Sequence, residues 1–77
     1  MLAFVQIATD SENPEGLTEK LRSYPEIRDI YMLFGKWDVV AIAEVDDADK
    51  LGTFVIEKIR KIEGVRDTAT QIVARKL

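Results

Sequence analysis

One aspartate, Asp38, is the residue whose type and position are best suited to chemistry. It stands at the head of an apolar run, residues 39–45, directly after the glycine-containing stretch 35–37. A carboxylate at such a turn either caps the backbone of the turn or contacts a ligand. We therefore place the candidate chemistry at the tip of a predicted hairpin, and both interpretations of Asp38 stay open at this point.

A second group of acids, Asp46, Asp47 and Asp49, follows the same apolar run. Carboxylates this close together can hold a divalent cation, but they also suit a helix start, as N-cap and as charges on the positive end of the helix dipole. We favour capping and predict no metal site. Because the chain has no His and no Cys, we expect no zinc site, no proton transfer by histidine and no thiolate chemistry. We also expect no cofactor.

The composition bounds the class of protein. With 77 residues, the chain is expected to form a single domain over residues 1–77 with a limited core. Its net charge of −3, without a long basic block, argues against non-specific nucleic-acid binding. The apolar N-terminus is too short for a signal peptide, and no run approaches the roughly 20 apolar residues of a membrane span. We expect a soluble, cytoplasmic chain.

Hydrophobic spacing and turn residues predict the order β-α-β-β-α-β. The first helix has an expected start at Asn13-Pro14-Glu15 and must end before Pro25. The second helix has a predicted buried face of Leu51, Val55, Ile59 and Ile62, with Gly64 after its end. The predicted strands are residues 2–8, 27–34, 37–45 and 66–75.

Two such β-α-β units predict a ferredoxin-like α+β fold, with a four-stranded antiparallel sheet and both helices on one face. The other face would carry apolar side chains and no helix. Such a face predicts a partner, most simply a second copy related by two-fold symmetry, which gives a dimeric α/β sandwich. The candidates for this open face, or their neighbours if the register differs, are Leu2, Phe4, Tyr31, Leu33 and Ile72.

Two motifs together resemble a known family. Residues 35–40 read G-K-W-D-V-V and residues 62–70 read I-E-G-V-R-D-T-A-T. In their order and spacing they are similar to the RAM domain, the effector-binding domain of the Lrp/AsnC transcription regulators. That family commonly shows Gly-x-Tyr/Trp-Asp on the hairpin and Thr-x-Thr entering the last strand. The resemblance covers essentially the whole chain.

The resemblance implies a tight dimer through the sheet faces and a ring of dimers, an octamer or a decamer, that holds small effectors, often amino acids, near the hairpin. Full-length Lrp/AsnC regulators become candidate partners. Family regulators carry a helix-turn-helix domain ahead of the first strand, whereas here a strand is predicted from the second residue. We therefore expect a stand-alone RAM protein that modulates transcription regulators or amino acid metabolism without binding DNA itself.

The resemblance also assigns candidate ligand-binding residues. Gly35 and Asp38 match the hairpin contacts, and Thr68 and Thr70 match the Thr-x-Thr pair. An ammonium group would suit Asp38, while backbone N–H groups near Gly35 and the Thr hydroxyls would suit a carboxylate. The neighbours that could line the pocket are Leu33, Phe34, Lys36 and Trp37.

Other interpretations remain open. Thr68 and Thr70 also read as ordinary strand residues, and Trp37 as interface packing. A small dimeric ferredoxin-like enzyme of the monooxygenase or isomerase type is an alternative function, although no paired acid and base is evident, and we predict no enzyme. A purely structural assembly subunit is the third possibility, because the same apolar sheet face would serve it.

Overall fold

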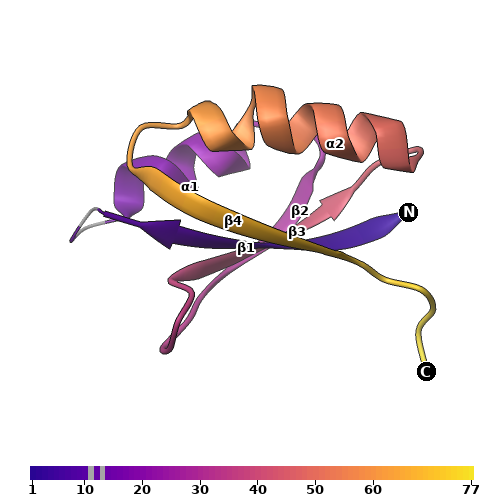
Figure 1. The fold of residues 1–77 in the computed structure, drawn as a ribbon, viewed down its shortest axis with the longest axis horizontal. Helices are drawn as coiled ribbons and strands as arrows, with labels where there is room; N and C mark the ends of the chain where they lie inside the picture. The colour runs from indigo at the N-terminus through magenta and orange to yellow at the C-terminus, as the bar shows by residue number, and fades with distance from the viewer. Residues whose placement is uncertain (11, 13) are drawn as a thin grey trace.

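The computed structural model describes residues 1–10, 12 and 14–77 of the chain. Strands and helices follow in the predicted order, β-α-β-β-α-β, with a 3₁₀ turn before the last strand (Figure 1). Their bounds are β1 (Leu2–Thr9), α1 (Glu15–Arg22), β2 (Ile27–Met32), β3 (Val39–Glu44), α2 (Ala48–Glu57), η1 (Ile59–Lys61) and β4 (Val65–Ile72).

The strands form one antiparallel sheet in the order β2-β3-β1-β4. The first strand of the chain therefore lies inside the sheet, where Val5 is opposite Ala41 on one side and Thr70 on the other. Both helices cover the same face, as Figure 1 shows. This is the ferredoxin-like α+β fold that the sequence predicts. No helix in the described part of the chain is long and apolar enough to cross a membrane.

The helix-covered face of the sheet holds the hydrophobic core. Because side chains alternate along a strand, every second residue of β1 and β3 points toward the helices. Tyr24, just after α1, packs edge-on against Phe54 of α2, with 5.6 Å between ring centroids and 86° between ring planes. The sheet contributes Ala3, Val5, Ile7, Val39, Ala41 and Ala43, and the helical layer contributes Leu17, Leu21, Leu51, Phe54, Val55 and Ile59.

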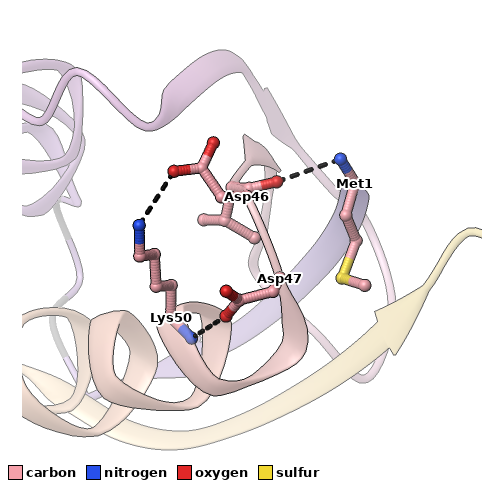
Figure 2. Close-up of polar contacts among 5 residues, drawn as sticks. Met1, Asp46, Asp47 and Lys50 are labelled. Carbon is pink, nitrogen blue, oxygen red and sulfur yellow. Dashed lines mark hydrogen bonds and ion pairs between the residues drawn. The ribbon is translucent and has the colours of Figure 1, made fainter.

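The start of α2 confirms the capping interpretation of the acid cluster (Figure 2). Asp47 is the N-cap, and its Oδ1 accepts a 2.8 Å hydrogen bond from the backbone N–H of Lys50. Asp46 Oδ2 accepts a 3.0 Å bond from Lys50 Nζ. This hydrogen bond, and then the charge of the partner, lower the pKa of Asp46 and raise the pKa of Lys50. The amino group of Met1 donates to the carbonyl of Val45 at 2.9 Å, which fixes β1 beside this start.

Three strand ends were predicted wrongly, each by two or three residues. β2 ends at Met32 instead of residue 34, and β3 begins at Val39 instead of residue 37. Gly35, with a φ of 145°, turns the chain there, and the N–H of Leu33 donates to the carbonyl of Asp38 at 2.9 Å, so the residues between form a loop. β4 ends at Ile72 instead of residue 75, and its backbone contact with β1 stops one residue later, where the N–H of Val73 donates to the carbonyl of Leu2, the first residue of β1.

The second helical segment is also shorter than its apolar pattern predicts. α2 ends at Glu57, where Lys58 takes a φ of −114°, so Ile59 lies in η1 and Ile62 beyond it. Both still pack against the core, which means that the predicted face is right although one helix does not carry it. The sequence pattern did not single out Phe54, a buried core residue. The predicted N-cap of the first helix, Asn13, lies outside the described residues.

The open face carries most of the residues predicted for it. Phe4 lies opposite Ile42, and Tyr31 lies opposite Val40, all on the side away from the helices. The prediction for Ile72 was wrong: this residue lies opposite Ala3, which places it at the margin of the covered face. Leu33 falls in the hairpin loop, just after β2. A surface with apolar side chains is thus left without a helix, as predicted.

Candidate functional site

Asp38 connects the hairpin loop to the centre of the sheet. Its backbone N–H donates to the carbonyl of Ile7, and its Oδ2 accepts a hydrogen bond from the N–H of Thr9, each at 2.9 Å. The half-buried carboxylate is therefore held against the end of β1, a contact between residues 29 positions apart. It caps a neighbouring strand rather than its own turn. Oδ1 accepts no hydrogen bond from the described residues, so this oxygen still has its capacity to accept one.

The loop in front of Asp38 projects away from the helical layer (Figure 1). Phe34 is fully exposed at its tip, and Gly35 has the positive φ that a residue with a side chain rarely adopts. Lys36 Nζ lies 5.8 Å from the ring centroid of Trp37, a cation–π contact at the base of the loop. Leu33 and Trp37 are half-buried. The loop thus presents an apolar side chain, Phe34, before its glycine and a cation, Lys36, after it.

The two threonines lie on the other side of β1 from Asp38. Thr68 is opposite Ile7, the residue whose carbonyl binds the N–H of Asp38, so both stand near one end of the sheet. Because one strand separates them, their backbones are about 10 Å apart. Thr70, opposite Val5, lies one step further along β4 and is exposed. The structure thus brings Asp38 and Thr68 to the same end of the sheet and leaves Thr70 further away.

The main surface hollows of the single chain lie elsewhere. One of about 640 Å³ separates α1 from the start of β4 and is lined by Leu17, Lys20 and Gly64, among others. Another, of about 780 Å³, lies on the open face over Phe4 and Ile42. Neither includes a predicted ligand-binding residue. A small molecule at the hairpin tip would therefore need further walls, and a second copy of the chain is the simplest source of them.

No group of carboxylates in the described residues is arranged to hold a metal ion. Asp47 caps α2, Asp46 pairs with Lys50, and Asp49 lies in the first turn of the helix. The contact that the sequence did not reveal is the one between Thr9 and Asp38. Neither residue carries a signal for it, because the two are joined only by the register of β1 against β3.

The whole described chain matches one family. The family model of the Lrp/AsnC ligand binding domain covers residues 2–77. An uncharacterized HTH-type transcriptional regulator of Pyrococcus furiosus is 33% identical over 75 residues, which span 91% of this chain and 49% of the relative. The chain thus spans about half the length of the curated relatives it matches. These relatives are named as HTH-type transcriptional regulators, and the matched family model is that of their ligand-binding domain.

Solved structures show the same fold. The crystal structure of FFRP-DM1 superposes with a TM-score of 0.88 at 32% identity, covering 94% of this chain and 96% of that one. The transcriptional regulator NMB0573 of Neisseria meningitidis, solved as a complex with L-Met, has a TM-score of 0.91 at 22% identity, over 99% of this chain and 51% of that one. The resemblance inferred from the hairpin and Thr-x-Thr motifs is confirmed, and the chain belongs to the Lrp/AsnC ligand-binding domain family.

Proposed function

We propose that this domain binds an amino acid or a related small metabolite between neighbouring copies at the hairpin tip, and that occupancy modulates a transcription regulator. One observation carries the proposal: the carboxylate of Asp38 is fixed by the N–H of Thr9 at the hairpin, with Oδ1 left open. The family is a ligand-binding family, and a structural neighbour was solved with L-Met. Both support a small zwitterion as ligand.

The chemistry of the site fits such a ligand. Asp38 would accept charge-assisted hydrogen bonds from the ammonium group, and its geometry is already set by Thr9, so little ordering is needed on binding. The hydroxyl of Thr68 and the backbone N–H groups beside Gly35 would meet the carboxylate. Phe34 and Trp37 would face the ligand side chain and select among apolar groups.

Assembly completes the pocket in this proposal. The open face, with exposed Phe4 and Tyr31, would pair with the same face of a second copy, because isologous contacts between identical patches close into a dimer. Dimers would then meet at the hairpin tips in a ring, an octamer or a decamer. The remaining predicted residues, Lys36, Leu33 and Thr70, would line this second contact. A full-length Lrp/AsnC regulator is the proposed partner that reads the bound state.

Direct contact with DNA is not part of the proposal. The chain carries 14 acidic and 11 basic residues, a balance that gives little attraction to phosphates. We expect no shift of a DNA duplex in a gel at physiological salt. Binding that weakens steeply with salt would contradict this part of the proposal.

The binding proposal is tested by titration calorimetry with a panel of amino acids on three variants. Asp38→Asn keeps an oxygen that can accept from Thr9 but loses the charge, whereas Asp38→Ala loses both. We expect the best ligand to bind Asp38→Asn about 2 kcal/mol less tightly, roughly thirtyfold, since a hydrogen bond to a charged group is lost. Asp46→Asn removes a carboxylate far from the hairpin and should leave binding unchanged.

Three outcomes would contradict the proposal or a part of it. Unchanged affinity in Asp38→Asn, with the wild type binding normally, would reject the role of this carboxylate. An absence of heat or thermal shift with every amino acid, in a protein shown to be assembled, would reject the ligand class. Loss of binding in Asp38→Ala alone, with Asp38→Asn normal, would mean that Asp38 serves only to hold the end of β1.

A further inference from the structure

The segment that follows β4, residues 73–77, leaves the sheet on the side away from the helices. Its last backbone contact with the sheet is the N–H of Val73, which donates to the carbonyl of Leu2 at 2.9 Å. Figure 1 shows the chain then curving away from β1 on the side opposite α1 and α2. It carries the sequence V-A-R-K-L, and Leu77 is fully exposed. We call residues 73–77 the C-terminal arm.

Between the C-terminal arm and the open face lies the hollow of about 780 Å³. Its floor is apolar, formed by Leu2 and Phe4 of β1 and Ile42 of β3, and Phe4 is 42% exposed there. The arm lines the hollow without filling it. An apolar floor of this kind is stabilised when a further apolar side chain covers it, and Leu77, at the end of the arm, is an apolar side chain that its own chain leaves fully exposed.

The charges around the hollow are complementary between copies. On the open face, Glu44 lies 4.0 Å from Arg28, whereas Asp29 and Asp67 make no ion pair with the described residues. Asp29 lines the hollow, opposite Ile42. Arg75 and Lys76 of the C-terminal arm also line it and make no ion pair with the described residues. One acid without an ion pair thus lines the same hollow as two bases of the arm.

We propose that the C-terminal arm of one copy enters the hollow of a second copy, and that the two copies exchange arms across a two-fold axis. Leu77 of one copy covers Phe4 and Ile42 of the other, and Arg75 or Lys76 pairs with Asp29 of that copy. Because the contact is isologous, both hollows are filled at once. This inference rests on the proposed pairing of the open faces, and it identifies the element that secures that pairing.

The experiment uses two charge reversals on the full chain, Arg75→Glu and Asp29→Arg, studied separately and mixed at low ionic strength. In a dimer of either variant alone, like charges meet at both exchanged contacts. We therefore expect the dissociation constant of that dimer to rise on the order of tenfold above the wild-type value. In a mixture, each arm finds an opposite charge on the other variant. Native mass spectrometry should then show more mixed dimer than the half expected from random pairing.

Arg60→Glu is the matched control, since it makes the same change of charge on η1, in the helical layer, and should leave the dimer unchanged. If the variants are weakened and mixing gives only random pairing, the arm contacts its own open face and the inference is wrong. If neither variant weakens the dimer, it is also wrong. A monomeric wild type would instead reject the proposed pairing of the open faces, which sedimentation velocity determines before any mixing.

Discussion

The two faces of the sheet differ in how far their apolar side chains are buried. Along β1, Val5 and Ile7 are 0% exposed beneath the helices, while Phe4 between them is 42% exposed on the other side. On β2, Tyr31 of the open face is 56% exposed. A chain of this length has helices for one face only, so its fold leaves apolar surface that a single copy cannot bury. The covered face holds the core that stabilises the fold, and we propose that the open face serves assembly.

Truncation of a buried side chain on the covered face should destabilise the fold more than any of the other substitutions. Ile7→Ala should lower the free energy of unfolding by about 3 kcal/mol, because it removes a fully buried side chain and leaves a cavity. Urea denaturation at one fixed protein concentration measures it. Ile56→Ala, the same change at a residue of α2 that is 58% exposed, is the control and should cost less than about 1 kcal/mol. Equal losses of unfolding free energy in the two variants would show that burial on the covered face does not set stability.

A charge on the open face should act on assembly instead of on the fold. Phe4→Glu would weaken the pairing of copies by about 2 kcal/mol, since it places a charge where an aromatic side chain would be buried. Sedimentation equilibrium measures the dissociation, and circular dichroism should show an unchanged fold. Ile56→Glu exposes the same charge on the helical layer and should leave the dimer intact. A Phe4→Glu variant that assembles as the wild type does would show that the open face is not the contact.

The covered face and the element order were predictable because they depend on local signals. The local signals are the apolar run of residues 2–8, the Asp cluster before α2 and Pro25 after α1, and each acts within a few residues of the structure it fixes. The strand ends depend on non-local facts and were wrong. β4 stops beside Leu2, the first residue of β1, after which only Val73 makes a backbone contact with that strand, and the hairpin strands stop where Asp38 binds Leu33 and Ile7.

The candidate site was predictable in residue type but not in geometry. The sequence left Asp38 as either a cap or a ligand contact, and the structure shows that one oxygen accepts from Thr9 while the other accepts from none of the described residues. That division depends on the register of β1 against β3, which no short motif specifies. Thr68 and Thr70 read as one motif, yet the strand between them and Asp38 places only Thr68 near the same end. Ligand binding by these residues remains a prediction.

The position of α2 over the sheet depends on where this helix begins. Asp47→Ala should lower the free energy of unfolding by about 1 kcal/mol, because the N–H of Lys50 loses its cap. Asp49→Ala removes a first-turn acid that acts only on the helix dipole and should cost less than half as much. Thermal unfolding of both variants measures the difference. Equal costs would mean that the charge of the cluster matters and the cap does not.

The smallest expected effect concerns the exposed pair of Asp46 and Lys50 at this same helix start. The hydrogen bond and charge of Lys50 lower the pKa of Asp46, so its contribution to stability is present above about pH 4 and is lost as pH falls through the folded pKa. The pKa of Lys50 is raised, so its contribution is present at neutral pH and is lost only in strong base.

Wild type and Asp46→Asn should therefore differ slightly in unfolding free energy at pH 7 and converge near pH 2, and added salt should shrink the difference. Denaturation at both pH values, with and without salt, measures this. A difference that persists in acid would show that Asp46 acts through its shape and not its charge. The helical layer would then be held in place by its buried contacts with the sheet and by the Asp47 cap. The ion pair on its surface would contribute nothing measurable.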